Sequence, residues 1–178
     1  MDFSSWEIKF YELIDKLPFD PALYHPHVVH FAVALPLTAF LFQWFSLASP
    51  DKGYQGSSNL LFYLGITAIV FAFITGKAAA PDIKPTLTIA GQDIFDTHKE
   101  VGTYITLAFM MLLPIKMFSS SLKSEITKNM VMIFMVITLI GLYYEISSGH
   151  QLVYDYAAGT QMQYAKWHNI FTIFSYSL

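Results

Sequence analysis

Three histidines, His25, His27 and His30, lie within six residues near the start of the chain and lead directly into a long apolar segment. An imidazole is costly in hydrocarbon. Histidines at the start of an apolar helix therefore usually bind a metal or haem, carry protons or satisfy a specific hydrogen bond. We take this stretch as the candidate site and ask which elements place other polar groups beside it.

The composition is typical of a polytopic membrane protein. Of 178 residues, 54% are hydrophobic and 13% are charged, and the mean hydropathy is +0.46, whereas about a quarter of the residues of a soluble domain are charged. The chain has no cysteine, which excludes disulfides, thiolate metal sites and covalently attached c-type haem. A net charge of −3 without any arginine gives no basic patch, so nucleic acid is not an expected partner.

Four apolar segments have about the length that a helix needs to cross a bilayer. Short connections between them predict an all-α, four-helix up-and-down transmembrane bundle over residues 24–156. The expected spans are residues 28–48, 59–76, 97–118 and 129–148.

The two ends of the chain are expected to lie outside the bundle. Residues 1–20 place apolar side chains on one helical face, which predicts an amphipathic helix in the membrane interface. Residues 157–178 are aromatic and apolar but too short to cross. They predict a segment that lies along the interface or docks on a partner.

Between the second and third spans, Pro81, Pro85 and Gly91 predict an irregular polar connection over residues 77–96. Thr97 and Glu100 have the spacing of a capping box, which would start the third span at His98.

In such a bundle the starts of spans one and three share a surface with the ends of spans two and four. Five of the six histidines are therefore expected at one surface. Glu145 at that surface is expected to be a proton carrier or a partner of His150 or Lys77. The residues gathered there are His25, His27, His30, Lys77, His98, Lys99, Glu145 and His150.

The lysine distribution predicts the orientation. The two short connections hold four lysines (Lys52, Lys116, Lys123 and Lys128) and two acidic residues, whereas the histidine side holds six lysines and eleven acidic residues. Lysine-rich short loops face the cytoplasm. Both termini and the histidine cluster are therefore expected on the extracytoplasmic side.

Small residues recur every three or four positions along the second span, at Gly65, Ala68, Ala72, Gly76 and Ala79. Such a stripe usually lets a neighbouring helix approach closely, and it could also admit a flat cofactor. Helix packing is the preferred interpretation.

The segment from His25 to Leu35 resembles the opening of the bacterial membrane proteins grouped as domain of unknown function 2231. Further matches follow in the family's order, at Thr75-Gly76, at His98 with Gly102, and from Gly149 to Tyr154. The resemblance covers residues 24–159. It implies four spans in a bacterial inner membrane and carries over His25, His30 and His98. His150 stands where the family usually has glycine, and no reaction is established for the family.

The preferred functional hypothesis is a b-type haem that carries electrons between membrane quinol and an extracytoplasmic redox protein. Non-covalent haem in a bundle needs two imidazoles from different helices. The expected ligands are His30 and His98, with His150 as the nearest substitute and His25 in support. Lys77 or Lys99 would pair with the haem propionates.

Two alternatives remain open. His30 and His98 with further imidazole or carboxylate ligands could form a Zn or Cu site for binding or transport. The chain could instead be a structural anchor subunit of a larger membrane complex, with its histidines only hydrogen-bonded. Hydrolase, phosphate-loop and dinucleotide motifs are missing from the sequence, which favours an electron-transfer or anchor subunit over a standalone enzyme.

Overall fold

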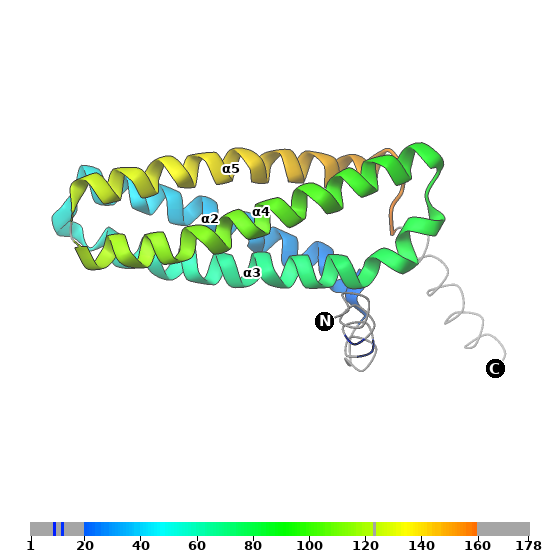
Figure 1. Ribbon diagram of the computed structural model, residues 1–178, viewed down its shortest axis with the longest axis horizontal. Coiled ribbons are helices and arrows are strands. Elements are labelled where there is room, and N and C mark those ends of the chain that lie inside the picture. Colours follow the sequence, from blue (N-terminus) through cyan, green and yellow to red (C-terminus); the bar gives the residue numbers. More distant parts are fainter. Residues whose placement is uncertain (1–8, 10–11, 13–19, 123, 160–178) are drawn as a thin grey trace, which may run out of the picture.

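Four long helices make up the bundle in the computed structural model, which describes residues 9, 12, 20–122 and 124–159 (Figure 1). No strand occurs among these residues, so the all-α prediction is confirmed. The helices are α2 (Pro21–Ala48), α3 (Tyr54–Ile83), α4 (Ile89–Leu122) and α5 (Glu125–Tyr154), with short 3-10 helices η1 (Pro50–Lys52) and η2 (Lys84–Thr86).

Each long helix contains a segment that is long and apolar enough to cross a membrane, which confirms the prediction of four spans. Large apolar side chains such as Phe31, Leu60, Met111 and Tyr143 point outward, as lipid contact requires. The candidate spans are Pro21–Ala48, Tyr54–Thr86, Ile89–Ser119 and Ile126–Tyr154.

The topology is up-and-down. The α2–α3 and α4–α5 connections lie at one end of the bundle, while the start of α2, the α3–α4 corner and the end of α5 lie at the other (Figure 1). The histidine-bearing helix ends are therefore gathered at one end, as predicted.

The prediction of a long irregular connection over residues 77–96 was wrong. α3 continues through Pro81 to Ile83, and α4 begins at Ile89. Burial explains the extension, because these turns pack around a second small core of Leu87, Phe95 and Leu152 at the histidine end.

The predicted capping box at Thr97 was also wrong. Thr97 lies inside α4, and its hydroxyl donates to the Asp93 carbonyl 3.0 Å away. His98 therefore lies in the third turn of α4 and not at its start.

The stripe of small residues on α3 is a packing surface for α2, which confirms the preferred interpretation. Ala72 and Ala79 are buried. A methyl group added at Gly65 would come within 2.9 Å of the Pro36 ring, and one added at Gly76 within 2.8 Å of the His25 ring. The stripe lets α2 approach closely enough for its side chains to contact α3 backbone.

Lys116 was predicted to lie in a short connection, and the structure corrects this. Its side chain is only 1% exposed. Its ammonium donates to Gln43 Oε1 at 2.7 Å and to Ser58 Oγ at 3.0 Å, and it lies 5.3 Å from the centroid of the Phe62 ring. This polar group joins α4 to α2 and α3 at the end opposite the histidines. Fewer lysines are left to indicate orientation, which stays a prediction.

The predicted interfacial helix over residues 1–20 and the aromatic segment over residues 157–178 lie almost entirely outside the described residues, so both stay predictions. Within the described part, the Asp20 carboxylate accepts from the Ala22 N–H at 3.1 Å and caps α2. After α5, the Ala158 N–H donates to the Leu152 carbonyl at 2.9 Å, which turns the chain back against the small core.

Candidate functional site

His25 lies in the second turn of α2 and is fixed by α3. The Asp20 cap and Pro21 at the first helical position set the start of α2. His25 Nδ1 lies 3.0 Å from the Ala72 carbonyl oxygen and 3.2 Å from Thr75 Oγ1. Because a carbonyl only accepts, Nδ1 carries the proton, and the lone pair of the neutral ring lies on Nε2.

His98 lies on α4 and is fixed by α5 in the same manner. Its Nδ1 lies 2.9 Å from Ser148 Oγ and 3.1 Å from Glu145 Oε1. The Ser148 hydroxyl donates to the Glu145 carbonyl at 2.8 Å, so its oxygen accepts from His98. The proton of the neutral His98 ring is therefore also on Nδ1, and Nε2 again holds the lone pair.

Glu145 is the third polar group of the site. Its side chain is 16% exposed. Oε1 pairs with His98, whereas Oε2 is buried and has no hydrogen-bond partner among the described residues. An unsatisfied buried oxygen is costly in a folded protein, so Oε2 is a place where an added donor would be stabilised. The expected partners His150 and Lys77 are replaced by His98.

A glycine lies against each of these three side chains. A methyl group would come within 2.8 Å of the His25 ring at Gly76, within 2.7 Å of Glu145 Oε1 at Gly102, and within 3.0 Å of the His98 ring at Gly149. These are the same glycines that carry the family resemblance. Their spacing in the sequence therefore reflects the room needed for a polar side chain from a neighbouring helix.

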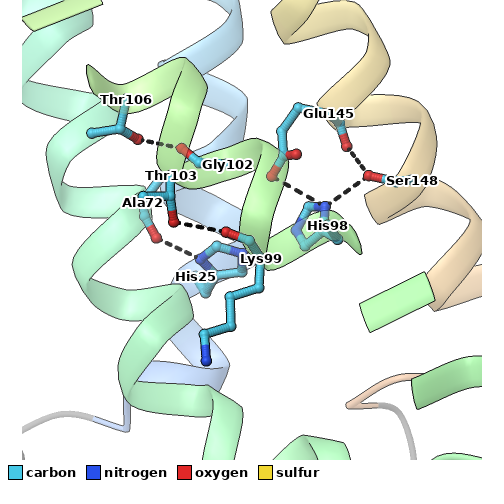
Figure 2. Close-up of polar contacts among 9 residues, drawn as sticks. All are labelled: His25, Ala72, His98, Lys99, Gly102, Thr103, Thr106, Glu145 and Ser148. Carbon is cyan, nitrogen blue, oxygen red and sulfur yellow. Dashed lines mark hydrogen bonds and ion pairs between the residues drawn. The ribbon is translucent and has the colours of Figure 1, made fainter. Parts of the chain in front are cut away.

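The two imidazoles lie close enough to interact electrostatically. Figure 2 shows them in one view, His25 against α3 and His98 against α5. The hydrogen bonds of His25 stay within the α2–α3 hairpin, and those of His98 stay within the α4–α5 hairpin. A ligand held by both rings would therefore bridge the two hairpins.

The other predicted histidines make local contacts. His27 and His30 are exposed, and their Nδ1 atoms lie 3.0 Å and 2.6 Å from the carbonyls of Leu23 and Pro26, one turn earlier in α2. His150 is exposed and stacks on Tyr154, with 4.2 Å between the ring centroids. The ligand roles of His30 and His150 stay predictions, while the imidazole that interacts electrostatically with His98 is the half-buried His25.

The two predicted lysines lie in different surroundings. The Lys77 ammonium lies 5.5 Å from the centroid of the Phe73 ring on its own helix. Lys99 is exposed and lines a surface cavity together with Lys84. Their pairing with propionates stays a prediction.

A preformed multi-ligand metal site is not seen in the described part of the chain, where no three His, Asp or Glu side chains are grouped to hold an ion. The donor set of the site is instead two imidazole Nε2 atoms with a carboxylate behind one of them. Sequence reasoning missed Ser148 and the pairing of Glu145 with His98. The sequence signal for these contacts was the match of Gly102 and Gly149 to the family pattern, to which no role had been assigned.

The comparisons with known proteins bear on the whole of this site. The sequence model of a family described as predicted membrane protein (DUF2231) matches residues 22–162, a range that includes every residue from His25 to Ser148. No curated protein and no solved structure matches the chain. The match and the four candidate spans agree. This chain therefore belongs to the DUF2231 family of predicted membrane proteins.

Proposed function

We propose that this protein is a small subunit located in a bacterial inner membrane, and that it binds one b-type haem through His25 and His98. It would pass electrons between membrane quinol and an extracytoplasmic redox protein. One observation carries the proposal: two neighbouring imidazoles from different hairpins each have Nδ1 fixed by the protein and Nε2 left with the lone pair.

This arrangement is the one that histidine ligands usually adopt. A ligating imidazole donates its other N–H to a carbonyl or carboxylate, which fixes the tautomer and the ring orientation. The Ala72 carbonyl does this for His25, and Glu145 with Ser148 does it for His98. Two neutral imidazoles from facing helices are a usual ligand set for haem in a bundle.

The residues around the two imidazole rings would help to hold a haem in place. Gly76 and Gly149 leave room for the rings against α3 and α5, and Glu145 increases the electron donation of His98 through Nδ1. A bound b-type haem would supply one-electron chemistry. The protein's own residues would set the positions of the two rings and keep the protons on Nδ1.

The alternatives differ in what they require. A Zn or Cu site with an open position takes three protein ligands, and a third group would have to move toward His25 and His98. A structural anchor would use the same hydrogen bonds only to hold the helices. A Zn or Cu site would use the same two Nε2 lone pairs, whereas an anchor would leave them unused, since only Nδ1 of each ring is hydrogen-bonded among the described residues.

The test is the absorption spectrum of the purified full chain, expressed with ample haem and recorded oxidised and reduced. The proposal expects a Soret band and an α-band that shift on reduction. If no such bands are seen, haem binding is excluded. Elemental analysis of the same sample then separates the alternatives. Stoichiometric Zn or Cu would indicate a metal site, whereas a sample without either metal would indicate an anchor subunit.

A further inference from the structure

A cavity of about 410 Å³ opens at the corner where α3 and η2 meet α4, apart from the two imidazoles. Its lining combines two cationic side chains, an amide and an apolar wall. The residues are Lys84, Lys99, Gln92, Pro81, Pro85 and Phe95.

The charges of this cavity sum to one uncompensated positive charge. The Lys84 ammonium lies 2.7 Å from each carboxylate oxygen of Asp96, so this pair is neutral. Lys99 is exposed, and no ion pair neutralises it among the described residues. Gln92 Nε2 donates one N–H to the Leu87 carbonyl at 3.2 Å, which leaves its second N–H available.

The position of the cavity along the membrane normal narrows the choice of ligand. About 20 helical residues cross the hydrocarbon, whereas the candidate spans Tyr54–Thr86 and Ile89–Ser119 hold 33 and 31 residues. The corner between them therefore lies outside the hydrocarbon, in the interfacial region. Phospholipid phosphates lie in this region of both leaflets, and a lysine side chain near the membrane surface attracts anionic head groups. The prolines and Phe95 offer apolar surface to the first carbons of the acyl chains.

We propose that this cavity binds the headgroup of an anionic phospholipid. The phosphodiester carries one negative charge, which Lys99 compensates, and the Lys84 ammonium and the Gln92 amide donate hydrogen bonds to its oxygens. The proposal does not depend on haem. The same phosphate chemistry could be met by free phosphate, and the experiment separates the two sources.

The experiment measures lipid retention by native mass spectrometry of the full chain released from detergent. The probes are phosphatidylglycerol and phosphatidylcholine with matched acyl chains, and inorganic phosphate as competitor. We expect selective retention of phosphatidylglycerol, a loss of about fivefold in Lys99→Gln, and no loss in Lys52→Gln, an exposed lysine at the opposite end.

Three outcomes would overturn this inference. Lys99→Gln could retain phosphatidylglycerol as well as the wild type does. Inorganic phosphate could displace the lipid at equal concentration, which would identify a free-anion site. Lys99→Gln could lower the haem content without changing lipid retention, which would assign Lys99 to a propionate and leave the haem proposal standing.

Discussion

His98 Nδ1 on α4 lies 3.1 Å from Glu145 Oε1 on α5. Glu145 reaches this position because Gly102, one turn after His98 on α4, leaves room for its carboxylate. One helix thus carries both the imidazole and the space for its partner. The pair fixes the His98 ring within a bundle whose outer surface faces lipid.

We expect Glu145→Ala to weaken haem binding by about 10–100-fold, the usual effect of removing a group that orients a ligand. Glu145→Gln should retain most of the affinity, since an amide oxygen still accepts from Nδ1. Titration of the purified apoprotein with haem measures both. The control is Glu100→Ala, which removes an exposed carboxylate of α4 that pairs with Tyr104. Equal losses in all three variants would refute an orienting role for Glu145.

Gly76→Ala and Gly149→Ala should each displace one imidazole. The added methyl groups would lie 2.8 Å from the His25 ring and 3.0 Å from the His98 ring. Crowding of this kind costs about 1–3 kcal/mol. The haem-to-protein ratio should fall with the stability. Gly56→Ala is the matched control, because no atom lies within 4 Å of its added methyl group, and a normal ratio in Gly76→Ala would contradict the proposed place of His25.

Gln43→Leu should destabilise the opposite end of the bundle by about 1.5–3 kcal/mol, since it removes a 2.7 Å acceptor from the buried Lys116 ammonium. The double variant Gln43→Leu with Lys116→Met should recover most of this loss, because the buried charge is then also removed. Unfolding in mixed detergent micelles measures the free energies. Additive losses in the double variant would show that the two residues are not coupled.

Single cysteines can report the orientation, because the chain has none of its own. Ile89→Cys lies at the histidine end, where the side chain is 84% exposed. A membrane-impermeant maleimide added to spheroplasts should label it. Lys52→Cys, at the other end, should react only after lysis. The reverse pattern would place the candidate site on the cytoplasmic side.

The sequence predicts the four spans because their apolar segments are long and separated by turns. The α3–α4 corner was predicted incorrectly because burial of Leu87, Phe95 and Leu152 outweighs local proline and glycine signals. Lys116 was missed for a related reason. A lysine near a span end can extend to water or turn inward, and only the positions of Gln43 and Ser58 on neighbouring helices decide between these.

The sequence also does not show which of His25 and His30 faces α3. Both belong to the start of the same apolar helix, so hydropathy places them at similar depth. Five residues of α-helix rotate the side chain by about 140°, which separates the two rings onto different faces. The face that meets α3 carries His25, as its contacts with Ala72, Thr75 and Gly76 show.

The haem-to-protein ratio of His25→Ala, His30→Ala and His98→Ala, each purified as the full chain beside the wild type, tests the central claim most directly. Haem held by His25 and His98 predicts a ratio near one for the wild type and for His30→Ala, and a ratio near zero for the other two variants. His27→Ala controls for the loss of an exposed imidazole from the same helix. Loss of haem in His30→Ala with retention in His25→Ala would contradict the ligand pair, and a haem-free wild type would contradict the function.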